Sequence, residues 1–369
     1  MPNPSSLPAR RRSIAGLFAV SCVILLASGC ARLAPPSPAK PTNVILMIGD
    51  GMGLAQISTL YFNDTVATSY FEQFGAFGYI KTKPTDAEIT DSAAGATSFA
   101  SGVKTYNAAI GMDADTARVE TIVERLSRTG QLTGLVATSS IVHATPASFF
   151  AHVAHRNMYE DIATQLPGSG VDFFAGGGVK FFADRKDGQD VYNQLIDAGF
   201  AMDSTALAGT PAPPQKYGFL LAPDGMPRVL EGRGPFLTDA TRMALAYLDQ
   251  GDRGFFLMVE GSQIDWGGHE NNTEYLMTEM ADFNDAIGAA IEFAARDGNT
   301  LVVVTADHET GGLALSTGAG YGEMIPTFST GGHTGSLIPV FAFGPGAEAF
   351  TGIYENTEIF HKIVSAAAW

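Results

Sequence analysis

The sequence predicts an α/β fold in which one doubly wound, mostly parallel β-sheet is flanked by helices. Three observations bear on it: short apolar runs typical of buried strands, helical patterns between these runs, and a length of 369 residues, which suits two domains or one large α/β domain. Hydrophobic residues make up 46% of the chain, an ordinary fraction for a globular protein, so a disordered chain is not expected.

Residues 1–29 are expected to be a lipoprotein-type signal peptide. Three arginines at 10–12 precede an apolar stretch at 14–27 that is too short for a comfortable membrane span, and small residues lead to Cys30. This pattern predicts cleavage before Cys30, lipid attachment to that cysteine, and a protein exported to the periplasm or cell surface and anchored to the membrane.

A plain signal peptide cut elsewhere is the alternative. Residues 11–14 also partly match a twin-arginine signal.

Residues 30–41 are rich in proline and are expected to form a tether to a catalytic domain at 42–369. The other cysteine, Cys22, would leave with the signal peptide, so the mature chain would have no internal disulfide.

The whole chain has a net charge of −16, and removal of residues 1–29 leaves 19 basic and 38 acidic residues, a net charge of −19. This balance argues against a nucleic-acid partner, because phosphate backbones need clustered Lys and Arg. Bound cations would still allow an anionic substrate.

Five short apolar runs predict buried parallel strands. In chain order they are residues 44–48, 132–138, 255–259, 301–305 and 339–343.

Helices are predicted between these runs at residues 119–128 and 273–295. The second is indicated by apolar residues spaced three to four apart, and Gly298 is expected to end it. These apolar residues are Leu276, Met280, Phe283, Ile287 and Ile291. Residues 184–235 are rich in Gly, Pro and Asp and are expected to form a surface excursion rather than a separate domain.

Acidic residues and histidines follow four of the predicted strands, and His333 lies in the segment before the fifth. Ligands of a doubly wound sheet bind beyond the carboxyl ends of its strands, and carboxylates with imidazoles gathered there favour a metal site. The candidate residues are Asp50, His143, Thr145, Glu260, Asp265, His269, Asp307, His308 and His333. Taken singly, each has an ordinary interpretation as a turn, surface or loop residue. Their occurrence together at one edge of the predicted sheet favours the metal site. His152, His155 and His361 are expected to have no catalytic role.

Ser92 is the candidate nucleophile. It begins an Ala-rich run at 92–97, which places it at the N-terminus of a helix, where free N–H groups and the helix dipole favour an anion. A serine hydroxyl needs a base or a metal to become a good nucleophile, and no histidine is near in sequence, so a metal is the expected activator. Judged alone, Ser92 is equally interpreted as a helix cap.

Together these segments resemble the alkaline phosphatase family of metal-dependent phosphomonoesterases. The resemblance covers about residues 42–369, in order and nearly end to end. Its motifs are MIGDGMG at 47–53, TDSAAGAT at 90–97, VEG at 259–261, IDWGGH at 264–269, TADHETGG at 305–312 and HTG at 333–335.

The resemblance implies two Zn²⁺ ions and a third metal, usually Mg²⁺. The first zinc would be held by Asp265, His269 and His333. The second would be held by Asp50, Asp307, His308 and the oxygen of Ser92. The third metal would be held by Asp50, Thr145 and Glu260, and Arg156 would clamp the phosphate.

Two positions depart from the family pattern. His143 stands where the best-studied bacterial members have Asp, although animal and some other bacterial members have His. Trp266 stands where many relatives have Lys or His. A neutral imidazole suits Zn²⁺ or Co²⁺ better than Mg²⁺, so the third site is expected to bind Mg²⁺ weakly or to take Zn²⁺ or Co²⁺ instead.

The function that the resemblance implies is hydrolysis of a broad range of small phosphate monoesters, through a phosphoserine at Ser92, by a protein that is usually a homodimer. A related phosphodiesterase would usually have a Thr nucleophile and lack the third-metal set. A sulfatase would need a Cys/Ser-x-Pro-x-Arg context, which Ala94 and Ala96 do not fit. A non-catalytic alternative is a surface lipoprotein that only stores metal or phosphate. The complete set of ligand candidates argues against this alternative.

Overall fold

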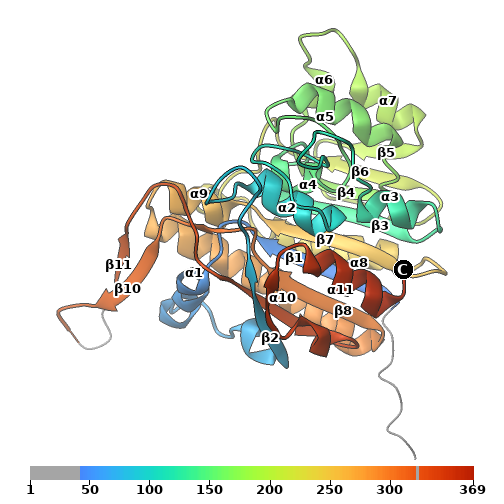
Figure 1. Cartoon of the computed structure of the whole chain (residues 1–369). Coiled ribbons are helices and arrows are strands. Elements are labelled where there is room, and N and C mark those ends of the chain that lie inside the picture. Colours follow the sequence, from blue (N-terminus) through green and yellow to red (C-terminus); the bar gives the residue numbers. More distant parts are fainter. Residues whose placement is uncertain (1–41, 321–323) are drawn as a thin grey trace, which may run out of the picture. The chain divides into compact units, whose positions relative to one another are not determined.

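The computed structural model describes residues 42–320 and 324–369, and is built around one ten-stranded sheet (Figure 1). The predicted signal peptide and tether lie outside the described residues. In spatial order the strands are β14 (Gly352–Glu355), β2 (Ala76–Lys81), β13 (Ile338–Phe343), β8 (Thr300–Thr305), β1 (Asn43–Gly49), β7 (Phe255–Gly261), β3 (Leu132–Ser140), β4 (Phe173–Gly177), β6 (Lys216–Leu220) and β5 (Phe200–Asp203).

Most neighbouring strands run parallel, which confirms the predicted fold class. The central strands β1, β7 and β8 are buried along their whole length, as continuous apolar runs require.

The prediction that residues 339–343 form a parallel strand is wrong, because β13 runs antiparallel to both β8 and β2. No helix lies between β8 and β13 among the described residues of that connection, which instead contains the short strands β9 (Glu309–Thr310), β10 (Leu313–Thr317), β11 (Met324–Phe328) and β12 (His333–Thr334). A parallel return would need a crossover connection, so the chain re-enters the sheet from the edge at which it left.

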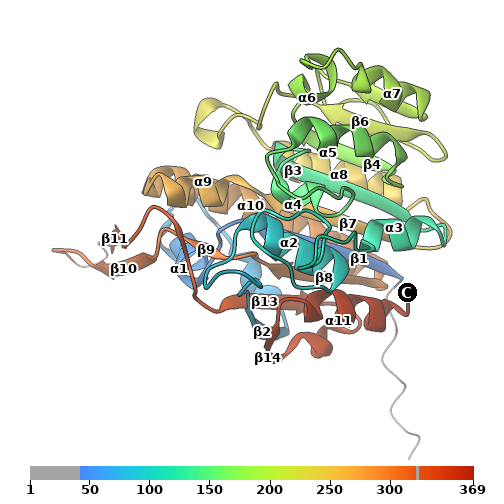
Figure 2. The ribbon, with the colours of Figure 1, turned by 45° about the horizontal axis from the view of Figure 1, so that its top comes forward.

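Helices cover both faces of the sheet. In Figures 1 and 2, α2 (Ser92–Ser101) and α11 (Glu358–Ala367) lie on one face, and α8 (Phe236–Leu248) and α10 (Thr273–Asp297) lie on the other. The prediction for α10 is confirmed, and Gly298 ends it in the left-handed conformation, at φ 75°. The helix predicted at 119–128 is shorter, α3 (Ile122–Ser127), because Thr121 and Glu124 form a capping box at its start.

The remaining helices are short. They are α1 (Leu54–Ser58), α4 (Ala144–Ala147), α5 (Tyr159–Gln165), α6 (Lys180–Ala183), α7 (Val191–Asp197) and α9 (Gln263–His269). No helix in the described part of the chain is long and apolar enough to cross a membrane.

Residues 184–235 are more than the expected surface excursion. They contain α7 and also β5 and β6, which pair with each other and, through β6, with β4. This segment therefore extends the main sheet at one edge. Its strands are short and only partly buried, so they lack the continuous apolar run that would have revealed them.

Candidate metal centre

The candidate ligands gather where the parallel strands end. Strands β8, β1, β7 and β3 are neighbours, and their register aligns Ile48 of β1 with Thr305 of β8 and Glu260 of β7. Asp50 follows β1, and Asp307 follows β8. The chain segments that follow these strands therefore meet at one edge of the sheet.

The structure brings the predicted ligands together in three groups. Within each group the ligand atoms lie within 4.8 Å of one another. The groups are Asp265, His269 and His333; Asp50, Asp307 and His308; and Asp50, His143 and Glu260. Asp50 belongs to two of the groups, so it can bridge neighbouring cations.

In the first group, Asp265 and His269 lie one turn apart on α9, although the two glycines between them have low helix propensity. A Cβ on Gly267 would lie 2.7 Å from the backbone nitrogen of Leu276. The glycine therefore permits α9 to lie close to the start of α10.

The ring nitrogens of His269 and His333 show that this group fits a cation. The Nδ1 atom of His269 donates to the carbonyl of Gly331 at 2.7 Å, and that of His333 donates to the carbonyl of Thr90 at 2.9 Å. Both Nε2 atoms then carry lone pairs, and they lie 3.1 Å apart beside the Asp265 carboxylate. Two facing acceptors repel each other unless a cation binds both.

The second group is fully buried and short of donors. Both oxygens of Asp50 and the Oδ2 atom of Asp307 lack a hydrogen-bond partner among the described residues. Burial raises the pKa of both carboxyls, and for Asp50 the neighbouring acids Asp307, Asp265 and Glu260 raise it further. Burial also lowers the pKa of His308, so its ring is neutral and can act as a ligand. Buried carboxylates without partners are costly, so these residues fit a divalent cation.

The third group combines Glu260, Asp50 and His143. Glu260 Oε2 accepts from Ser262 at 2.6 Å and from Ser139 at 3.2 Å, while its Oε1 atom has no partner. Burial raises the pKa of Glu260 to about 7. The buried Thr145 hydroxyl faces Glu260 without a hydrogen bond of normal geometry.

His143 lies beside Arg156, which competes with a metal for a lone pair of the His143 ring. Burial, followed by the nearby Arg156, lowers its pKa to about 3, so the ring is neutral and carries one N–H. Its Nε2 atom lies 3.4 Å from Nη2 of Arg156, a donor, and its Nδ1 atom has no partner. The ring of Trp266 lies edge-on to it, with centroids 6.0 Å apart. If Nε2 accepts from Arg156, Nδ1 holds the proton and has no lone pair for a metal.

Ser92 is the first residue of α2 and is 2% exposed. The cap is Asp91, whose carboxylate accepts from the Ala94 amide at 3.0 Å. Ser92 Oγ is therefore not occupied with capping, and it lies 3.3 Å from Nε2 of His308.

Arg156 reaches the same place from the segment between α4 and α5. Its Nη1 atom donates to Asp91 Oδ2 at 3.0 Å and to Ser92 Oγ at 3.4 Å. Burial would raise the pKa of Asp91, but Arg156 and the capping bonds lower it overall. Asp91 thus keeps its charge and holds the guanidinium beside Ser92.

Thr310 is a site residue to which the sequence analysis gave no role. Its buried hydroxyl donates to Asp265 of the first group and lies 3.2 Å from Nδ1 of His308 in the second. When Nδ1 of His308 donates to this hydroxyl, the Nε2 lone pair is left for a metal. The signal was present in the sequence, because Thr310 lies inside the motif at 305–312.

The fold and these ligand groups define a metal-binding α/β protein with a serine and an arginine at its centre. The chain belongs to the alkaline phosphatase family, whose sequence model matches residues 41–327. It is 42% identical to alkaline phosphatase 4 of Bacillus subtilis over 293 residues, which is 75% of this chain and 63% of that protein. It is 32% identical to alkaline phosphatase of Escherichia coli over 415 aligned positions, covering 89% of this chain and 86% of that one. The chain thus spans less than two thirds of the Bacillus relative.

Solved structures agree with this assignment. Alkaline phosphatase from the Antarctic bacterium TAB5 matches with a TM-score of 0.88 and 51% identity, over 90% of this chain and 99% of that one. A variant of that enzyme in which a histidine is replaced by aspartate has been solved with Mg bound in its M3 site, and it matches equally well, with a TM-score of 0.88.

Proposed function

We propose that this protein hydrolyses phosphate monoesters to an alcohol and inorganic phosphate. The observation that carries the proposal is the position of Ser92: its hydroxyl lies at the start of α2, between Nε2 of His308 at 3.3 Å and Nη1 of Arg156 at 3.4 Å. A nucleophile, a ligand group and an anion clamp therefore converge on one point. Membership of the alkaline phosphatase family supports the same activity.

Two Zn²⁺ ions suit the first two groups, because imidazole and carboxylate ligands favour zinc. Bound there, they would supply Lewis acidity that lowers the pKa of the Ser92 hydroxyl and stabilises the leaving oxygen. Phosphate dianions would then be accepted by a chain whose net charge is −16.

Ser92 carries out the first step. Its hydroxyl releases its proton to solvent, its oxygen attacks phosphorus, and a Ser92–phosphate bond forms. The bond from phosphorus to the ester oxygen breaks, and the alcohol leaves with a proton from solvent. Water then attacks the phosphoserine, phosphate departs and the hydroxyl is restored. Arg156 binds two non-bridging oxygens as a fork, and the free N–H groups at the start of α2 favour the same anion.

The proposal is tested with paired substrates. We expect a phosphate monoester to be turned over much faster than the corresponding diester, and we expect a strong chelator to abolish turnover. Zn²⁺ should restore activity better than Mg²⁺ alone, since the histidine-bearing groups suit zinc. A diester preference, or full recovery with Mg²⁺ alone, would contradict the assignment.

The third group is proposed to bind Mg²⁺ weakly, or Zn²⁺ or Co²⁺ in its place. His143 is neutral, and Arg156 competes for the lone pair on its ring. We expect His143→Asp to raise Mg²⁺ affinity, because a carboxylate adds a charge and can accept from Arg156 while facing the metal. A Mg²⁺ titration of zinc-loaded wild type and variant checks this. Superimposable curves would exclude His143 as a determinant of the third site.

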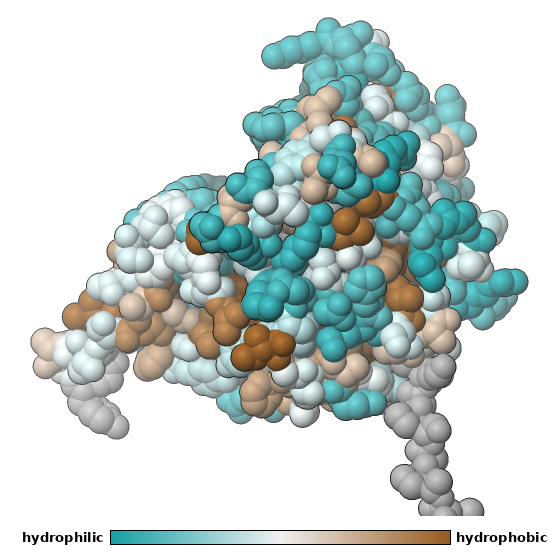
Figure 3. Space-filling view, in the orientation of Figure 1, coloured by the Kyte–Doolittle hydropathy of each residue, from teal (hydrophilic) through white to brown (hydrophobic). Residues whose placement is uncertain are grey.

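The protein is proposed to be exported and anchored to a membrane by lipid on Cys30, and to form a homodimer. The family resemblance supports the dimer, and so do three exposed apolar residues, one on the β10–β11 hairpin and two on the last two strands at one end of the sheet: Ile325 of β11, Phe77 of β2 and Ile353 of β14. Figure 3 shows hydrophobic surface on the side of the β10–β11 hairpin. Membrane fractionation of Cys30→Ala tests the anchor, and sedimentation of the purified protein tests the dimer.

A further inference from the structure

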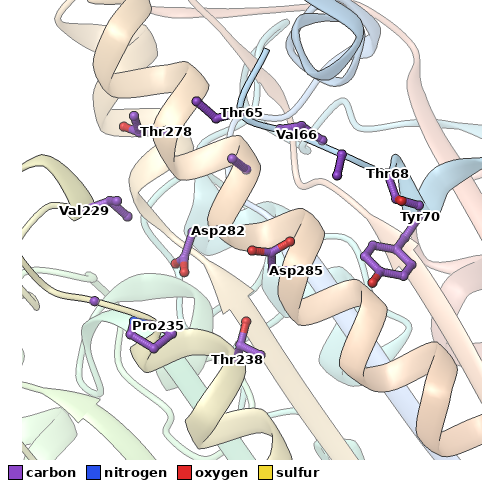
Figure 4. Close-up of a pocket in the computed structure, with 13 residues that line it drawn as sticks. Thr65, Val66, Thr68, Tyr70, Val229, Pro235, Thr238, Thr278, Asp282 and Asp285 are labelled. Atoms are coloured by element: carbon purple, nitrogen blue, oxygen red, sulfur yellow. The ribbon is translucent and has the colours of Figure 1, made fainter. Parts of the chain in front are cut away.

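A cavity of about 470 Å³ lies where the start of α8, the middle of α10 and residues 65–70 meet (Figure 4). None of the residues that line it belongs to the three metal-ligand groups. The cavity is therefore separate from the site of the proposed reaction.

Hydrogen bonds hold two walls of the cavity to α10. The buried side chain of Asn284 accepts from the Tyr70 amide and donates to the Thr68 carbonyl, both at 2.9 Å. On the other side the buried side chain of Arg233 donates to Glu279 and to Asp282, and the Val229 amide donates to Glu279, so both ends of residues 229–233 are tied to α10. The cavity is thus built by specific polar contacts and does not depend on loose loop packing.

The charge that faces the cavity is negative. Asp282 and Asp285 line it one turn apart on α10, and its lining residues include no Lys or Arg. The charge of Arg233 is shared between Glu279 and Asp282. The Asp285 carboxylate makes no hydrogen bond or ion pair with any residue that the structure describes.

Neighbouring bases offset only part of the negative charge of these acids. Arg242, on α8, lowers the pKa of Asp285 but is itself 3.7 Å from Glu292. Asp285 is exposed on α10, and partial desolvation nevertheless raises its pKa, while burial raises the pKa of Asp282 to about 6.

A hydroxyl without a partner faces the same space. Thr238 is 6% exposed, and its Oγ1 atom has no hydrogen-bond partner among the described residues. Two other threonines of these helices, Thr241 and Thr278, donate to the carbonyl four residues back. In Figure 4 the Thr238 hydroxyl points from α8 toward Asp285 of α10. A buried hydroxyl without a hydrogen-bond partner is unfavourable, and a bound ligand would supply the missing hydrogen bond.

We propose that this cavity binds a small organic ammonium cation. Its N–H groups donate to the Asp285 carboxylate and to Thr238 Oγ1, and its alkyl part contacts Val66, Ala67 and Ala281 on the cavity wall. A bare metal ion fits less well, because the groups with metal-ligand spacing in the described chain include neither Asp282 nor Asp285. The apolar wall residues also offer a metal nothing to bind.

The probe is n-butylammonium, measured by titration calorimetry in a buffer without primary amines, with the neutral 1-butanol as the matched ligand. We expect a Kd on the order of 1 mM for the cation and no measurable binding of the alcohol. Asp285→Asn should weaken binding about tenfold or more, and Thr238→Val about threefold. Glu274→Gln removes the same charge from α10 outside the cavity and should leave binding unchanged.

Equal binding of cation and alcohol, or unchanged binding by Asp285→Asn, would overturn the proposal. An equal loss in Glu274→Gln would also overturn it, because the effect would then be one of overall charge. Phosphate monoester turnover by Asp285→Asn should equal that of wild type. A failed titration would therefore leave the proposed function standing.

Discussion

Asp50 and Asp307 are buried carboxylates whose outer oxygens face no donor. Their positions follow from the sheet, since Asp50 comes directly after β1 and Asp307 two residues after β8, and both strands are buried along their whole length. At the residue scale this arrangement is stable only when cations supply the missing partners. The metal-free protein should therefore carry a measurable electrostatic penalty.

Glu260 should make the stability of the metal-free protein depend on pH over a defined range. Its pKa is about 7 in the folded protein and 4.5 in a model peptide, so the folded state holds the proton more tightly. Stability of the metal-free protein should then fall as pH rises from about 4.5 to 7, because deprotonation favours the unfolded state. Relative to Glu260→Gln, the metal-free wild type should lose on the order of 3 kcal/mol over this window. Urea unfolding in chelator at several pH values measures the difference, and a difference independent of pH would refute the explanation.

Thr310 is predicted to position ligands of two neighbouring groups. Thr310→Val removes the hydroxyl that joins Asp265 to His308, while it keeps the volume of the side chain. We expect zinc affinity to fall 10- to 100-fold, as is typical when partners of metal ligands are removed. Zinc release to a competing chelator measures this without reference to turnover. Thr310→Ser should restore affinity, and if it fails as badly as valine, the hydroxyl is not responsible.

Residue types and positions were enough to name the ligand candidates, because all but His333 follow a strand whose apolar run is visible in the sequence, and His333 precedes one. The contacts between them were not predictable. The bond from Thr310 to Asp265 and the contact of His143 with Arg156 join residues 45 and 13 positions apart, and they depend on how the loops fold back. Asp91 was likewise missed as the cap, because Ser92 beside it is an equally good capping residue.

At the scale of the element, strong periodicity was predictive and short segments were not. The buried strands β1, β3, β7 and β8 and the long helix α10 each carry a clear pattern. The direction of β13 depends on the connection before it, and the apolar run alone does not encode it. Helix α9 forms although Gly267 and Gly268 have low helix propensity, because the close packing that these glycines permit outweighs propensity there.

Gly267→Ala should test that packing. The added Cβ would lie 2.7 Å from the backbone nitrogen of Leu276, which cannot move without shifting α10. We expect a loss of about 1–3 kcal/mol in the free energy of unfolding, together with weaker zinc binding at Asp265 and His269. Gly168→Ala is the control, since a Cβ there meets nothing within 4 Å. Equal stability of the two variants would mean that α9 adapts freely.

At the scale of the whole molecule, acidic composition and proposed function agree only through bound cations. A chain of net charge −16 repels phosphate dianions at long range, and a helix N-terminus and one arginine are modest attractions. The ligand groups at the strand ends reverse the local sign once they are filled. Ser92 is therefore expected to act only inside a cation-filled centre.

The most direct measurement is the chemical state of Ser92 during turnover. Zinc-loaded protein is mixed with a phosphate monoester labelled in its phosphoryl group and quenched in acid, and its peptides are analysed by mass spectrometry. We predict a labelled phosphate on Ser92 in the peptide that contains residues 90–97, and no label in Ser92→Ala. Turnover of the monoester without a labelled peptide, or label retained in Ser92→Ala, would contradict the assignment of Ser92 as the nucleophile.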